Sequence, residues 1–307
     1  MSSGEALLVV SGYASVDFAL QLAPFQGVDA TTQIRGRADE WPRYGGIAHV
    51  TRAAGSVSAG GAAAGAAAGD SAGALRVAAL SWVGEDAAGA GWIDAVAAGN
   101  AATTGIAVLG SRSPNAYLLY PEGDGTICLF DPGDCHTEGL SAAQRELLAG
   151  ATTVVVTIGP ERATRELLDA ISAECTVFWV LKQDPDSLPA DLATRLAGRA
   201  DIVTLSEGES GYLATIAANA RPGTHIVVTR GAAGSELRRV TGGAALETVG
   251  EVGAEPVRGV DTTGAGDTFS GTLAALIAGQ GERDTATLLA HISEAAAATA
   301  RMLAARA

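Results

Sequence analysis

Short apolar runs alternate along the chain with longer stretches rich in alanine and leucine. Six runs look like β-strands, at Leu7–Val10, Arg76–Leu80, Thr153–Val156, Val177–Val180, Asp201–Thr204 and Ile226–Thr229. Continuous apolar runs, unlike alternating ones, suit strands that are covered on both faces. The intervening stretches predict helices, at Arg162–Ala173, Asp191–Ala197, Thr268–Gly279 and Asp284–Ala307. Strands separated by helices predict an α/β fold in which helices flank a mostly parallel central sheet.

Two segments, residues 18–44 and 106–132, do not follow this alternation of strands and helices. The first alternates polar and apolar positions and holds two prolines. The second contains two strand-like runs around the pair Asp124-Gly125, a hairpin signal, at Asn115–Pro121 and Thr126–Phe130. We expect these two segments to form a small β-rich lid that projects from the main sheet of a single domain, residues 1–307.

The composition limits the partners that the chain can bind. It has 307 residues, of which 48% are hydrophobic, so it can bury a sizeable core. Its 34 acidic residues outnumber its 20 basic ones, which gives a formal net charge of −14. Nucleic acids and anionic membranes both attract clustered lysine and arginine, so we expect neither as a partner. Local phosphate binding stays open, because backbone amides can provide it without net positive charge.

Three further features favour a cytoplasmic protein. Residues 1–5 lack a basic region, and the apolar run that follows is too short for a signal peptide. The low-complexity segment Gly55–Gly73 is insufficiently hydrophobic for a bilayer span; we predict a helix start followed by a mobile loop, without a function. No C-x-x-C pair occurs among the three cysteines, which favours incidental reduced thiols: Cys128, Cys135 and Cys175.

The segment most suggestive of chemistry is a glycine-containing loop, Gly264-Ala265-Gly266, that runs directly into the predicted helix at Thr268. Glycines let the backbone approach a ligand, and a helix N-terminus adds partial positive charge, so the loop can form an anion hole for a phosphate in transfer. Asp267 follows at the helix start, where it can accept a proton from an attacking hydroxyl. A tight turn followed by a simple N-cap would also explain these residues taken alone.

The longer string Asp261–Phe269 is more specific, since it resembles the C-terminal signature of the ribokinase-like (PfkB) carbohydrate kinases. The resemblance implies a three-layer sandwich with a small β-sheet lid, and ATP and Mg²⁺ as cofactors. It also implies that Asp267 is the catalytic base and that the backbone of Gly264, Ala265 and Gly266 stabilises the moving phosphoryl group. The order of the other motifs extends the resemblance over almost the whole chain.

On the substrate side, the resemblance assigns hydroxyl binding to Asp17, which follows the first predicted strand, and backbone contact with the sugar to Gly45 and Gly46. Relatives often place an asparagine one or four residues after this glycine pair, where this chain has Ile47 and Val50. We expect that polar contact to be missing or replaced, and the two candidates for a replacement are His49 and Arg43. The segment Val83–Gly89 resembles a further family turn, to which we assign no chemistry.

On the nucleotide side, Ser206–Glu209 occupies the place of the family's Asn-x-x-Glu motif, in which the glutamate organises magnesium through water. Glu209 matches that glutamate, Glu207 is the neighbouring candidate, and Ser206 replaces the usual asparagine. One carboxylate can suffice, because magnesium keeps several waters. The resemblance also places three residues along the nucleotide, namely Thr229, Gly231 and Gly234.

The function that these residues imply is ATP-dependent transfer of a phosphoryl group to a hydroxymethyl group of a sugar or sugar derivative. A nucleoside kinase of the same family is an alternative, since aromatic side chains are available to hold a base: Tyr13, Phe18, Phe25, Trp41 and Tyr117. A non-catalytic nucleotide-binding regulator is a second alternative. Four arginines in or beside the expected lid hint at an anionic substrate, although surface charge balance explains them as well: Arg35, Arg37, Arg43 and Arg112. Relatives often form dimers through the lid sheet, which suggests a homodimer here.

Overall fold

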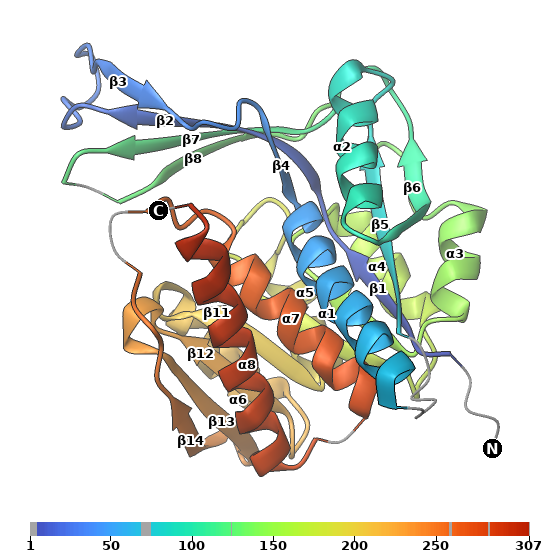
Figure 1. The fold of residues 1–307 in the computed structure, drawn as a ribbon. Helices are drawn as coiled ribbons and strands as arrows, with labels where there is room; N and C mark the ends of the chain where they lie inside the picture. Colours follow the sequence, from blue (N-terminus) through green and yellow to red (C-terminus); the bar gives the residue numbers. More distant parts are fainter. Residues whose placement is uncertain (1–4, 69–74, 124, 258–259, 282, 307) are drawn as a thin grey trace.

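The computed structural model describes residues 5–68, 75–123, 125–257, 260–281 and 283–306, and a nine-stranded sheet forms its centre (Figure 1). Its strands, from one edge to the other, are β14 (Ala245–Val252), β13 (Ser235–Gly242), β12 (His225–Thr229), β11 (Ile202–Ser206), β10 (Thr176–Val180), β9 (Thr153–Val156), β1 (Leu7–Ser11), β5 (Arg76–Val83) and β6 (Ala102–Val108). The seven strands from β12 to β6 run parallel, and β13 and β14 are antiparallel. The prediction of a mostly parallel central sheet is confirmed.

All six apolar runs are strands of this sheet, and β9 has the predicted bounds. The sequence pattern did not reveal β6, β13 and β14. The two edge strands β6 and β14 and the penultimate strand β13 mix polar with apolar residues, many of them at partly exposed positions. All three strands therefore lack the continuous apolar run by which a doubly covered strand is recognised.

Helices cover both faces of the central sheet. One face carries α1 (Ile47–Ala68), α2 (Ala87–Ala98), α7 (Ala265–Gln280) and α8 (Thr285–Ala304), and the other α3 (Ala142–Ala149), α4 (Glu161–Ala170), α5 (Ala190–Arg199) and α6 (Leu213–Asn219). Two short 3₁₀ helices, η1 (Glu207–Tyr212) and η2 (Gly231–Ala233), follow β11 and β12. In β9, Val154 and Val156 belong to one hydrophobic cluster and Val155 belongs to the other. The three-layer arrangement follows from this alternation, because each central strand must bury both of its faces.

A second sheet of five strands lies apart from the central one (Figure 1). It contains β2 (Ala14–Leu22), β3 (Ile34–Arg37), β4 (Arg43–Gly46), β7 (Asn115–Pro121) and β8 (Ile127–Asp131). The expected lid ranges need correction at their starts, because this sheet begins at Ala14 and residues 106–108 end β6 of the central sheet. The predicted hairpin is present as the antiparallel pair β7–β8, although Asp124 of its turn lies outside the described residues.

The low-complexity segment begins inside α1, which continues to Ala68; residues 69–73 lie outside the described part. Two glycines let α1 pack closely against its neighbours. A Cβ on Gly55 would lie 2.0 Å from the carbonyl oxygen of Gly99, and a Cβ on Gly271 of α7 would lie 2.3 Å from that of Val50. The helix that carries His49 is thus held directly against α7. Within the described residues, no helix has both the length and the apolar character that crossing a bilayer requires.

Candidate active site

Two adjoining pockets lie at the carboxyl ends of β9, β10 and β11. Pocket A, of about 450 Å³, lies between the second sheet and the loops after β9 and β10, and includes Asp17, Gly46 and Asp267. Pocket B, of about 330 Å³, follows the ends of β10, β11 and β12 and includes Glu209 and Gly266. Ligands of open α/β sheets bind at this edge, and the two pockets meet at the first turn of α7.

The first turn of α7 presents bare backbone to both pockets. Its N-cap is Gly264, with a φ of 77° that L-residues rarely adopt, and a Cβ there would lie 3.1 Å from the His49 ring. A Cβ on Gly266 would meet no heavy atom within 4 Å, so the backbone stays open towards pocket B. Since the first N–H groups of a helix have no partner within it, this turn can bind an anion.

Asp267 is the third residue of α7 and is buried, with 7% of its surface exposed. It does not cap the helix, because Gly264 holds that position and α7 has no side-chain cap hydrogen bond. A capping role therefore does not account for Asp267. Asp267 lines pocket A, and Gly266, the residue before it in the sequence, lines pocket B. The carboxylate of Asp267, which can accept a proton, is thus next to the candidate anion site.

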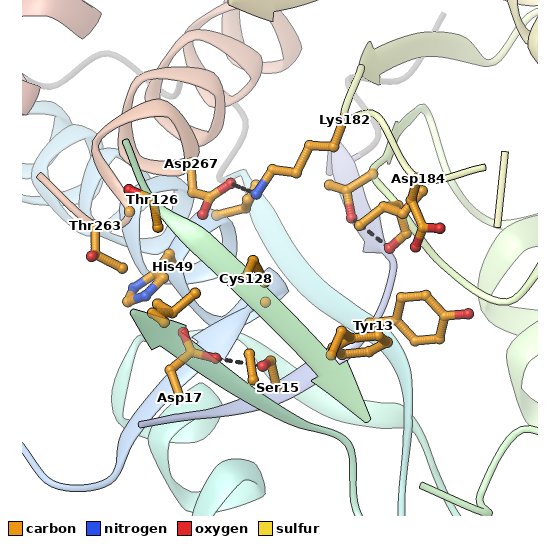
Figure 2. Close-up of a pocket in the computed structure, with 18 of the residues that line it drawn as sticks. Tyr13, Ser15, Asp17, His49, Thr126, Cys128, Lys182, Asp184, Thr263 and Asp267 are labelled. Atoms are coloured by element: carbon orange, nitrogen blue, oxygen red, sulfur yellow. Dashed lines mark hydrogen bonds and ion pairs between the residues drawn. The ribbon is translucent and has the colours of Figure 1, made fainter. Parts of the chain in front are cut away.

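Lys182, which was not predicted as a site residue, lies at the same junction. Its ammonium donates to Asp267 Oδ1 over 2.6 Å, as Figure 2 shows, and its side chain lines both pockets. Burial opposes the charge of Lys182, but the carboxylate of Asp267 outweighs it, so the pKa of this lysine is raised. A usable signal was present, because Lys182 comes two residues after a predicted strand and is the only lysine in the chain.

Asp17 lies within β2 of the second sheet rather than at the end of a central strand, which corrects the expected location. The Ser15 hydroxyl donates to its Oδ1, and a Cβ on Gly45 of the neighbouring β4 would lie 1.9 Å from its Oδ2. Burial, with a smaller contribution from the negative charge of Asp267, raises the pKa of Asp17 to about 6. The second sheet thus brings Asp17 and Gly46 into pocket A, and Gly45 makes room for the carboxylate.

The two residues considered as replacements for the missing asparagine differ in position. His49 lines pocket A, and its Nε2 has no hydrogen-bond partner in the part of the chain that the structure describes. Burial lowers the pKa of His49 to about 4, so the ring is neutral at ordinary pH. Arg43 instead bonds to Asp261 (2.7 Å) and Glu40 (3.2 Å), and so links β4 to the loop that leads into α7.

The other three arginines of the expected lid line neither pocket, as far as the described residues show. Arg112 pairs with Asp131 over 3.0 Å, and Arg37 lies over the ring of Trp41. Of the two explanations considered for these arginines, their positions favour surface charge balance over contact with an anionic substrate.

Of the residues expected along the nucleotide, Thr229 and Glu209 line pocket B. Glu209 Oε2 accepts from the backbone N–H (2.7 Å) and the hydroxyl (2.8 Å) of Ser206, which fixes the carboxylate at the start of η1. Gly231 and Gly234 both have positive φ and lie outside the lining of pocket B. A Cβ on Gly234 would lie 2.1 Å from the carbonyl oxygen of Val252, so packing against the end of β14 requires this glycine.

No group of three or more histidine, cysteine, aspartate or glutamate side chains is placed to hold a metal among the described residues. A single carboxylate beside a phosphate site matches the way Mg²⁺ is usually bound, through waters and substrate phosphates. Glu209, fixed at the rim of pocket B, fits that requirement.

Aromatic residues divide between the two faces of the second sheet. Tyr13 and Phe130 line pocket A with ring centroids 5.0 Å apart, and the Tyr13 hydroxyl lies 3.1 Å from that of Ser187. On the opposite face, the Phe18 ring contacts Trp41 and Tyr117. Of the five aromatic residues considered as base-binding candidates, only Tyr13 lines pocket A.

Comparisons with known proteins agree with this architecture. A model of the pfkB family carbohydrate kinases matches residues 35–305, and the chain therefore belongs to that family. Similar solved structures include an uncharacterized sugar kinase from Pyrococcus horikoshii (TM-score 0.71, 18% identity, 95% of this chain and 91% of that one). Arabidopsis thaliana ribokinase complexed with ribose and ATP is also similar, with a TM-score of 0.68, 17% identity, and coverage of 95% of this chain and 92% of that one. Burkholderia thailandensis nucleoside kinase in complex with inosine has a TM-score of 0.67, 18% identity, and coverage of 97% of this chain and 91% of that one.

At these identities the structures show a shared ribokinase-like fold, and they include enzymes named for different acceptors. Comparison with curated protein sequences found no match. Members of the family are ATP-dependent phosphotransferases, and the acceptor of this chain must be argued from its own site.

The raised pKa of Asp17 makes a prediction about stability. Folding moves this pKa from 3.8 to about 6, so the folded state favours the protonated form of Asp17. Above about pH 6 the carboxylate is ionised in the folded state, and this ionisation lowers the free energy of unfolding. Asp17→Asn removes that cost, and we expect it to stabilise the fold by about 1–3 kcal/mol near pH 7.5. As the pH falls from about 6 to about 4, the wild type takes up the proton and the difference should disappear.

Urea unfolding of both proteins at several pH values measures this effect. Asp29→Asn, at an exposed position, is the matched control and should leave stability unchanged throughout. A variant at position 17 that is less stable than the wild type near pH 7.5 would show that the carboxylate is not under strain.

Proposed function

We propose that the protein transfers the γ-phosphoryl group of ATP to a hydroxymethyl group of a sugar or sugar derivative. The observation that carries this proposal is the meeting of two pockets at one helix turn. Asp267 lines pocket A, the neighbouring Gly266 lines pocket B, and Lys182 lines both. An acceptor in pocket A and a nucleotide in pocket B would bring the hydroxyl and the γ-phosphorus together beside this turn, as in-line transfer needs.

In this proposal each residue has a defined task. Asp17 and the backbone of Gly46 bind acceptor hydroxyls, while Thr229 and the turn around Gly231 lie towards the nucleotide. The acceptor oxygen forms a bond to the γ-phosphorus as the bond from phosphorus to the bridging oxygen of ADP breaks, and the hydroxyl proton passes to Asp267. The amides around Gly264–Gly266 stabilise the charge on the phosphoryl oxygens.

Glu209 would hold Mg²⁺ through water, and the ion would offset charge on the β- and γ-phosphates when bound. The second sheet covers pocket A from one side, and we propose that it acts as a lid that excludes water as a competing acceptor. Two contacts join this sheet to the loop before α7: Arg43 with Asp261, and the Tyr120 hydroxyl with that of Thr263.

Replacement of the proposed base gives the first activity test. We expect Asp267→Asn to lower kcat by about 100- to 10,000-fold, because the amide cannot accept the proton, while ATP binding changes little. Acceptor-dependent ADP formation in a coupled assay measures kcat, and calorimetry measures ATP binding. The control is Asp94→Asn, at an exposed position on α2, which should behave as the wild type.

Turnover by Asp267→Asn within about threefold of the wild type would exclude Asp267 as the base. If none of the sugars or nucleosides tested makes the wild type consume ATP, the result would instead favour the non-catalytic regulator.

A nucleoside kinase is the second candidate, and the aromatic pair in pocket A supports it. Tyr13 and Phe130 line pocket A together with Gln183 and Asp184, so a flat base there would have aromatic rings for stacking and polar partners. A panel of sugars and nucleosides in the same assay separates the two candidates. If a nucleoside is the acceptor, Tyr13→Leu should raise its KM by roughly tenfold or more, because base stacking is lost. An unchanged nucleoside KM in this variant would contradict the stacking role.

We further propose that two copies pair through the face of the second sheet that points away from pocket A. That face exposes a cluster of large side chains, Trp41, Tyr117 and Leu129, with 37%, 45% and 54% of their surfaces accessible. Light scattering after size exclusion should give the mass of a dimer for the wild type and of a monomer for Tyr117→Asp. Val108→Asp, at an exposed apolar position on β6, should remain dimeric. A monomeric wild type would rule this assembly out.

A further inference from the structure

The chain uses arginine almost exclusively as its basic residue. Of its 20 lysines and arginines, 19 are arginine, and the single lysine is Lys182. That lysine lies between the two pockets, with its Nζ 2.6 Å from Asp267 Oδ1. Among the described residues that line either pocket, it is the only lysine or arginine. A chain that meets every other need for positive charge with arginine thus keeps a primary amine at this one place.

The surroundings of Lys182 are strongly acidic. Besides Asp267, its charge interacts with Glu209 of pocket B and Asp17 of pocket A. Before any ligand binds, the ammonium thus offsets the charge of carboxylates on both sides of the junction. Lys182 comes two residues after the end of β10, and Figure 2 shows its side chain extended towards Asp267, with a dashed line marking the ion pair at its Nζ. A nucleotide in pocket B would bring several negative oxygens to this same point.

Lysine and arginine differ in a way that matters here. The guanidinium is a rigid planar fork that binds a carboxylate through two parallel hydrogen bonds, and such a pair is strong and geometrically fixed. The ammonium is a compact charge on a flexible stem with three rotatable donors. A lysine can therefore leave Asp267 and turn to a phosphate with a small change in its torsion angles, whereas an arginine would keep the carboxylate occupied.

We propose that Lys182 is a further catalytic residue that exchanges partners during the reaction. This inference rests on the proposed phosphoryl transfer. In the free site the ammonium pairs with Asp267; when nucleotide and acceptor are bound, it donates to an oxygen of the γ-phosphoryl group, which frees Asp267 to accept the acceptor's proton. The phosphorus forms its new bond to the acceptor oxygen and loses the bridging oxygen of ADP, and Lys182 stays protonated throughout. Its charge stabilises the oxygens of the phosphoryl group in transfer.

Kinetics of two substitutions test the role. We expect Lys182→Met to lower kcat by roughly 100- to 1000-fold with the acceptor KM within about threefold of the wild type, as for loss of a group that acts in the transition state. Lys182→Arg keeps the charge and so protects the fold, yet it should still lose about tenfold or more in kcat. Arg52→Met removes a cation that lines neither pocket and should leave kcat unchanged.

Two kinetic outcomes would overturn the proposal. Wild-type kcat in Lys182→Arg would show that any positive charge suffices and that no exchange of partners is needed. A loss confined to the acceptor KM in Lys182→Met would make the lysine a substrate-binding charge. Neither outcome affects the proposed function, which fails separately if the wild type shows no acceptor-dependent turnover.

The single lysine also permits a readout that does not depend on turnover. Reductive methylation with ¹³C-formaldehyde labels Lys182 and the terminal amine alone, since the chain has no other lysine. We expect a non-hydrolysable ATP analogue with Mg²⁺ to shift the Lys182 methyl resonance in the wild type while the terminal amine signal stays in place. An unshifted Lys182 resonance at saturating nucleotide would overturn the contact with the γ-phosphoryl group, whatever the activity assays show.

Discussion

Asp267 and Lys182 form an ion pair at the point where two pockets meet, and much of the surrounding structure serves to hold that point in place. The carboxylate is buried at the start of α7, which suits its proposed role as a base beside a phosphate. A buried charge without a partner is costly, so the lysine stabilises the free site as well as offering charge to a ligand. Asp17 adds a second buried carboxylate, and its raised pKa shows the strain that remains.

Placing this turn requires close backbone packing. Gly271 lets α7 lie against the backbone of α1, and Gly264 turns in a left-handed conformation over the His49 ring. The second sheet is joined to the same region, because Arg43 of β4 bonds to Asp261 in the loop that precedes the turn. Changes at the second sheet can therefore reach the turn before α7, the proposed anion site, through the direct contact between Arg43 and Asp261. That link gives the proposed lid a physical route to the chemistry.

The central strands and the glycine turn before α7 were predictable for local reasons. A strand such as β9, covered on both faces, has a continuous apolar sequence, and the turn before α7 is encoded in a single short string. What the sequence concealed depends on contacts across the chain. The partner of Asp267 is 85 positions away, so no local pattern joins the two residues. Asp17 was expected at the end of a central strand, but pairing of β2 with β4 and β7 places it inside the second sheet.

The most direct test of the whole account is a crystal structure with Mg²⁺, a non-hydrolysable ATP analogue and the acceptor identified by the assay panel. The account predicts the γ-phosphoryl group over the first turn of α7, the acceptor hydroxyl within about 3 Å of an Asp267 oxygen, and Lys182 turned towards the phosphoryl oxygens. A nucleotide bound away from Gly264–Gly266, or an acceptor whose hydroxyl is remote from Asp267, would contradict it.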